Sequence, residues 1–148
     1  VYVLEVAARP IGGLCSSALR FRSEGAQAID GARGAVSLEE VLLRHALGED
    51  VTSYVREEVA SGVMMIPIPK RGVYRSVGGV DEAKQVAGVE DIQITAKPDT
   101  TLVPLPEGKS YLGFIFARAT TPAEVDRALR AAHAELRFAI DREVVLTA

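Results

Sequence analysis

Short runs of β-branched, aromatic and other apolar residues recur along the chain, with the length and composition of buried strands. They predict strands at residues 1–6, 62–69, 73–77, 89–96, 110–119 and 144–146. Lys70, Arg71 and Gly72 separate the second run from the third, which predicts a hairpin of antiparallel strands. Pro67 and Pro69 lack the backbone N–H group and limit ladder pairing at the far end of the second run.

Other stretches place apolar residues three and four positions apart, the spacing of one helix face. They predict helices over residues 14–21, 37–48, 80–87 and 121–138. The second and fourth of these begin with a capping-box pattern, Ser37 with Glu40 and Thr121 with Glu124. Gly48 is placed to end the second helix. Residues 23–36 and 98–106 are predicted to be connections.

Strands in hairpins with helices beside them predict an α+β fold with a mainly antiparallel sheet and helices packed on it, because the β-α-β alternation of a parallel sheet is missing. A chain of 148 residues can bury roughly two-thirds of its unfolded surface. We expect a division into residues 1–58, with a strand, a glycine turn and helices, and residues 59–148, a second α+β lobe packed on the first.

Net charge, cysteine content and the length of apolar runs indicate which binding partners and which cellular compartment to expect. The net charge of −3 and the scattering of the 17 basic residues argue against a nucleic-acid partner. Cys15 is the single cysteine, so no disulfide can form within the chain, and we expect a reducing, cytoplasmic compartment. No run approaches the roughly 18 apolar residues of a membrane span, so no membrane partner is expected. Because the chain starts at Val1 inside a predicted strand, we expect it to be a piece of a longer protein.

The candidate chemistry lies in the first predicted strand and the turn after it. Alternation along a strand puts Glu5 and Arg9 on the same face. Gly12 and Gly13 follow, and paired glycines allow close approach of a ligand to backbone N–H groups. A carboxylate, an arginine and a glycine turn suit Mg²⁺ and phosphate. From the residues alone, a structural Glu5–Arg9 ion pair beside an ordinary turn is the favoured interpretation.

Three further residues, Cys15, His45 and His133, carry groups that can react or bind a metal ion. Cys15 has no neighbouring base in the sequence and is interpreted as a small core residue. His45 falls on the apolar face of the helix predicted over 37–48, which favours a hydrogen-bonded core or boundary histidine over a metal ligand. His133 lies beside the apolar face of the last predicted helix and lacks the spacing of a metal site.

The stretch LEVAARPIGG resembles the last catalytic strand of ATP-grasp ligases, in which Glu-x-Asn-x-Arg precedes a turn rich in proline and glycine. The resemblance extends through SLEEVLLRHALGED, GVMMIPIPKRG and SYLGFIFARATTPAEVDRALRAAH to the C-terminal part of the amino-acid ligase branch, related to biotin carboxylase. It implies that Glu5 is a metal ligand and that Arg9 is a catalytic residue that binds phosphate or substrate carboxylate beside Gly12 and Gly13. Ala7 stands where the family usually has the second metal ligand, Asn.

The resemblance also implies an activity. The parent enzyme would be a carboxylate–amine ligase that uses ATP and Mg²⁺, forms an acyl-phosphate and joins a small-molecule carboxylate to an amine. On this interpretation residues 1–58 end the catalytic domain, and the isolated chain is inactive and binds no cofactor. A non-catalytic accessory or oligomerisation module is the alternative. A homo-oligomer is expected, because a strand edge and an apolar surface exposed by truncation recruit a second chain.

Overall fold

The computed structural model describes residues 6, 12, 14–23 and 34–142. The chain divides into two compact units, residues 1–58 and residues 59–148, which are described separately below. Within the described residues, no helix combines the length and the apolar character needed to cross a membrane.

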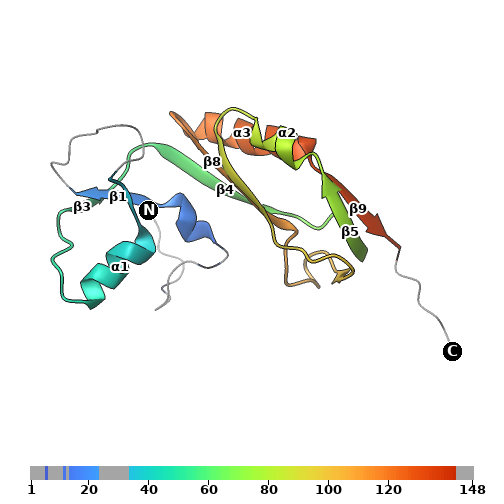
Figure 1. Ribbon diagram of the computed structural model, residues 1–148, viewed down its shortest axis with the longest axis horizontal. Helices are drawn as coiled ribbons and strands as arrows, with labels where there is room; N and C mark the ends of the chain where they lie inside the picture. The colour runs from blue at the N-terminus through green and yellow to red at the C-terminus, as the bar shows by residue number, and fades with distance from the viewer. Residues whose placement is uncertain (1–5, 7–11, 13, 24–33, 143–148) are drawn as a thin grey trace. The chain divides into compact units, whose positions relative to one another are not determined.

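The first unit contains a short three-stranded antiparallel sheet and two helices (Figure 1). Its strands have the order β2-β1-β3. An ion pair at 3.1 Å, from Arg22 Nε to Glu57 Oε1, ties β1 to the residue after β3. The described elements are η1 (Cys15–Ala18), β1 (Arg20–Ser23), β2 (Val36–Ser37), α1 (Leu38–Ala46) and β3 (Tyr54–Arg56).

The prediction of a helix over residues 14–21 is wrong beyond the first turn. Leu14 has a left-handed φ of +57°, and a single 3₁₀ turn follows before Leu19 becomes extended. Phe21 then pairs with Val36 on one side and with Arg56 on the other. The apolar spacing suits a helix, but strand pairing with distant residues decides the structure here.

Helix α1 begins and ends where the sequence predicts. The Ser37 hydroxyl accepts a hydrogen bond from the Glu40 N–H at 3.1 Å, and Gly48 follows the helix with a φ of +82°. Only half of the capping box forms, because Glu40 Oε1 accepts from Arg44 at 2.7 Å instead of from the Ser37 backbone. The predicted core or boundary position of His45 is wrong, since this side chain is exposed in the last turn.

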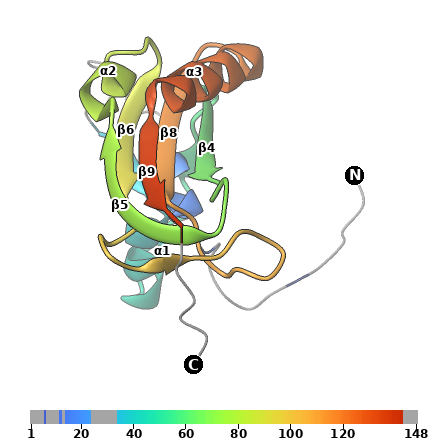
Figure 2. The ribbon, with the colours of Figure 1, turned by 90° about the vertical axis from the view of Figure 1, so that its right-hand side faces the viewer.

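The second unit contains two three-stranded sheets, with the orders β4-β8-β6 and β7-β5-β9, and every pairing is antiparallel. Helices α2 and α3 lie side by side against the strands (Figures 1 and 2). The predicted α+β class with mainly antiparallel strands is confirmed. The elements are β4 (Ala60–Ile66), β5 (Gly72–Gly78), α2 (Val80–Lys84), β6 (Val89–Ile94), β7 (Thr101–Leu102), β8 (Gly113–Ala119), α3 (Pro122–Glu135) and β9 (Arg137–Asp141).

The predicted hairpin between residues 62–69 and 73–77 does not form. Strand β4 pairs with β8 from Ala60 to Ile66, whereas β5 pairs with β7 and β9 in the other sheet. Pro67 and Pro69 follow β4, and a residue without an N–H group cannot continue the ladder. The segment between β4 and β5 therefore carries the chain from one sheet to the next.

The last helix is also shorter than predicted. Helix α3 ends at Glu135, Leu136 is extended, and β9 begins at Arg137 and pairs with β5. The helical period of the sequence continues through Phe138, but pairing with β5 stops the helix. The strand predicted at residues 144–146 lies outside the described residues.

The core of the second unit lies between the helices and the strands. Ile66, Leu112 and Ile115 are fully buried there. Helix α3 covers β4 and β8 with one apolar face, which explains the spacing seen in its sequence. That face consists of Val125, Ala128, Leu129 and Ala132.

Candidate functional site

The structure places only one of the four residues predicted to bind metal or phosphate. Glu5, Arg9 and Gly13 lie outside the described residues. Gly12 is an exposed turn residue whose carbonyl oxygen accepts a hydrogen bond from the Cys15 N–H at 3.3 Å. The roles of Glu5 and Arg9 therefore stay predictions.

The described residues do not by themselves fit a metal ion. Nowhere among them do three or more His, Cys, Asp or Glu side chains converge in the way a metal site needs. Cys15 is half-buried at the start of η1. His133, in the last turn of α3, is also half-buried.

A groove with a volume of about 550 Å³ lies in the second unit. It forms where the turn after α2, the end of β8 and the first half of α3 meet. Its lining combines four polar side chains with apolar residues, most of which are alanines. The lining residues are Val86, Ala87, Gly88, Arg118, Ala119, Thr120, Glu124, Arg127, Ala128 and Ala131.

Gly88 brings the turn after α2 close to β8 and α3. Its φ is +89°, a conformation that favours glycine, and its carbonyl oxygen accepts from the Arg118 N–H at 2.8 Å. A Cβ atom at this position would lie 3.3 Å from both the Ala128 Cβ and the Arg118 carbonyl oxygen. Because Gly88 has no side chain, the turn after α2 can lie close to Arg118 on β8 and to Ala128 on α3.

Arg118 is held in the groove wall by an irregularity in β6. The pairing of β6 with β8 shifts between Val89 and Asp91, and Glu90 lies at this shift in the register. Glu90 Oε1 accepts from Arg118 Nε at 2.9 Å. The shifted register thus supplies the carboxylate that orients the Arg118 guanidinium.

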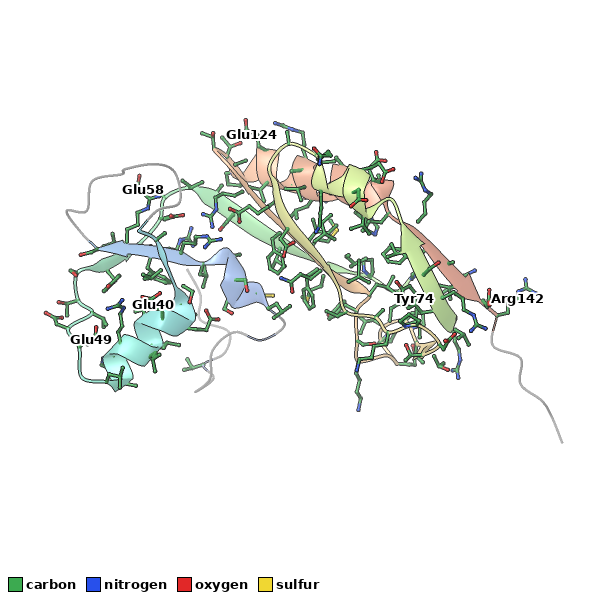
Figure 3. The ribbon with its side chains drawn as sticks, viewed as in Figure 1. Glu40, Glu49, Glu58, Tyr74, Glu124 and Arg142 are labelled. Atoms are coloured by element: carbon green, nitrogen blue, oxygen red, sulfur yellow. The ribbon has the colours of Figure 1, made fainter. Side chains whose placement is uncertain are left out.

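Glu124 is positioned by the start of α3, where Figure 3 shows it. The Thr121 hydroxyl accepts from the Glu124 N–H at 3.3 Å, and Glu124 Oε2 accepts from the Thr121 N–H at 3.0 Å. Pro122 follows Thr121 at the first position of the helix, where its missing N–H group leaves no bond unmade. The capping box predicted from Thr121 and Glu124 is confirmed.

Arg127 lies one helical turn after Glu124 and is exposed. Within the described part of the chain, the structure gives it no ion pair. Arg130, outside the groove lining, differs: its Nε donates to Asp126 Oδ2 at 2.8 Å. That hydrogen bond is the main reason why the pKa of Asp126 lies below its ordinary value. The groove therefore contains a cationic side chain, Arg127, that no described carboxylate neutralises.

Sequence reasoning did not find this groove. The capping-box pattern located Glu124, and helical spacing then places Arg127 on the same side of the helix. The contribution of Gly88 and Arg118 depends on the pairing of β6 with β8, which residue patterns do not reveal. Charged side chains beside small apolar residues suit binding of a small molecule.

A comparison with protein-family models matches residues 64–141 to the family described as L-amino acid ligase C-terminal domain 2. The chain belongs to this family. The match covers most of the second unit and all the residues that line the groove. It confirms the resemblance to the C-terminal part of an ATP-grasp amino-acid ligase.

The fold of this ligase domain also has a solved relative. The crystal structure of an L-amino acid ligase from Bacillus licheniformis matches with a TM-score of 0.62 and 22% sequence identity. The match covers 72% of this chain and 27% of that ligase chain, so the chain spans about a quarter of the length of its solved relative. At 22% sequence identity, this structural similarity establishes that the two proteins share a fold. A comparison with curated proteins found no match.

Proposed function

We propose that this chain is the C-terminal part of an ATP-dependent ligase that joins the carboxyl group of one amino acid to the amino group of another. The observation that supports this most directly is the family match over residues 64–141. The shared fold with the Bacillus licheniformis enzyme supports the same proposal. The whole enzyme would be more than twice as long as the chain, as its solved relative is.

The proposed reaction passes through an acyl-phosphate. ATP phosphorylates the carboxylate of the first substrate, and the amine of the second displaces phosphate to form the amide. In this proposal Glu5 contributes a carboxylate to the site of Mg-ATP, and Arg9 binds the transferred phosphate or the substrate carboxylate. Mg²⁺, when bound, neutralises charge on the phosphate oxygens. The turn at Gly12 and Gly13 would bring backbone N–H groups to the same anion.

The test is ATP consumption by a polypeptide in which this sequence follows an ATP-grasp catalytic region. Phosphate release should require two amino acids and should fall by about 100-fold or more in Arg9→Lys, since lysine lacks the planar fork of arginine. Glu5→Gln should lower kcat and respond to added Mg²⁺. Glu58→Gln changes an exposed carboxylate and serves as the matched control. Normal activity in both variants, with only a lower melting temperature, would assign Glu5 and Arg9 to a structural ion pair.

The 148 residues alone should not turn over ATP. Positioning of substrates supplies most of the rate in phosphoryl transfer, and the chain covers only 27% of the related ligase. Calorimetry of the isolated chain with Mg-ATP tests this expectation. Saturable binding near micromolar concentration that Glu5→Gln abolishes would contradict it.

A second candidate function, an interaction module, is favoured by apolar side chains on the first unit. Leu42 on α1 is exposed, and Leu43 and Leu47 keep 60% and 71% of their surface accessible. Exposed apolar clusters of this kind mark contact surfaces. Sedimentation of the chain should show self-association that Leu43→Asp weakens. A monomer at every concentration would contradict the interaction module. Ligase activity of the longer polypeptide would then support the ligase proposal over this alternative.

A further inference from the structure

We propose that the groove in the second unit binds a free α-amino acid in its zwitterionic form, with the carboxylate at Arg127 and the ammonium group at Glu124. All the residues involved lie in the described part of the chain. The proposal uses neither Glu5 nor Arg9, and it concerns binding, not turnover.

Arg127 is the natural partner of the carboxylate. It lines the groove, it is exposed, and the structure gives it no ion pair with a described residue. Its guanidinium can meet a carboxylate through two parallel hydrogen bonds. Arg118 already donates to Glu90 at 2.9 Å, and its charge adds to the positive potential of the same wall.

Glu124 supplies the opposite charge one turn earlier on the same helix. Its Oε2 atom accepts from the Thr121 N–H, and the described residues make no hydrogen bond to Oε1. Residues three apart on a helix have their Cβ atoms about 5–6 Å apart. A ligand that carries an anion and a cation on a single carbon can therefore contact both side chains.

The apolar lining residues and the volume of the groove indicate what the rest of the ligand is. Val86, Ala87, Ala128 and Ala131 offer apolar surface without bulk. A volume of about 550 Å³ lies in the range of small-molecule sites and leaves room for an apolar side chain. Inorganic phosphate would meet the two arginines but would be repelled by Glu124. The mixture of charges therefore favours an amino acid over a simple anion.

The experiment is an NMR titration of the 148-residue chain with L-leucine. We expect saturable shifts at the backbone amides of Gly88, Thr120 and Ala131, which surround the groove. Three further ligands test the two charged contacts one at a time. Leucinamide lacks the carboxylate, and N-acetyl-L-leucine lacks the ammonium group. Inorganic phosphate lacks both the ammonium group and the apolar side chain. Each should bind at least about tenfold more weakly than L-leucine, since each loses a charge-assisted hydrogen bond.

Two variants assign the charges to residues. Arg127→Gln should weaken L-leucine binding about tenfold or more and leave the already weak binding of leucinamide unchanged. Glu124→Gln should weaken L-leucine in the same way and leave N-acetyl-L-leucine unchanged; glutamine retains the capping-box hydrogen bond, so the helix start is preserved. Arg130→Gln is the control, because this arginine lies on the same helix, pairs with Asp126 and does not line the groove.

Several results would overturn the proposal. Absence of saturable shifts with L-leucine would exclude the site. Equal binding of phosphate or of N-acetyl-L-leucine would show a simple anion site without recognition of the ammonium group. Equal weakening by Arg130→Gln would show that the effect depends on the total charge of α3 and not on the groove. None of these results depends on ligase activity, so the proposed function is tested separately.

Discussion

Thr121 and Glu124 bind each other reciprocally at the start of α3, each side chain accepting a hydrogen bond from the backbone N–H of the other. This pair fixes the first turn of a helix whose apolar face covers the core of the second unit. It also holds Glu124 in the wall of the groove. One local interaction thus supports both the packing of α3 and the position of a charged group.

Loss of the Thr121 hydroxyl should destabilise the second unit. Thr121→Ala removes the acceptor for the Glu124 N–H, and loss of such a cap costs about 1 kcal/mol. For a unit of this size the melting temperature should fall by about 4–8 °C, measured by circular dichroism. Thr120→Ala removes a neighbouring exposed hydroxyl and should have little effect. Equal losses in both variants would show that the cap makes no special contribution.

Truncation of the central core should be far more costly than truncation at the surface. Ile115→Ala empties a fully buried position in β8 and should lower the free energy of unfolding by about 2–5 kcal/mol. Met65, on β4, pairs with Phe114 next to Ile115 but keeps 39% of its surface exposed, so Met65→Ala should cost less than about 1 kcal/mol. Denaturant unfolding of both variants measures the difference. Similar costs would contradict the described burial.

Two neighbouring glycines should respond differently to alanine. Gly79 has a φ of +82°, and a Cβ there would clash with the Glu135 carbonyl group, so Gly79→Ala should cost about 2–4 kcal/mol. A Cβ on Gly78 would meet nothing within 4 Å, and Gly78→Ala should change stability by less than about 0.5 kcal/mol. Chemical denaturation compares the two variants directly. A harmless Gly79→Ala would show that α2 and the end of α3 do not approach as described.

Removal of Arg130 should change the titration of Asp126. The Arg130 hydrogen bond holds the pKa of Asp126 below its ordinary value. Because the folded-state pKa is below the unfolded-state pKa, the stabilisation is present above the unfolded-state pKa and is lost as the pH falls through the folded-state pKa. Arg130→Gln should raise the pKa of Asp126 and reduce the acid dependence of stability. Carbon-detected NMR titration measures this pKa, and Arg127→Gln should leave it unchanged.

Features encoded by neighbouring residues were predicted well. The capping pattern from Thr121 to Glu124 located the start of α3, and the Ser37 cap with Gly48 bounded α1. Each of these signals depends on residues that are close together in the sequence, so a residue pattern reveals it. The α+β class followed from the same local patterns.

Features set by distant pairing were predicted poorly. Phe21 belongs to a strand because Val36 and Arg56 pair with it, and residues 137–141 form β9 because β5 lies beside them. The groove has the same origin, since the pairing of β6 with β8 brings Gly88 to Arg118. For Glu5 and Arg9, the resemblance to the ligase family supplies roles that the residue pattern alone leaves open.

The position of β8 between β4 and β6 also governs how the chain can fold as it leaves the ribosome. Strand β4 ends at Ile66 and β6 ends at Ile94, but both find their only described strand partner in β8, which begins at Gly113. During synthesis, this sheet cannot assemble until β8 has emerged from the exit tunnel. The apolar residues of β4 therefore stay without their strand partner while residues 67–112 are synthesised.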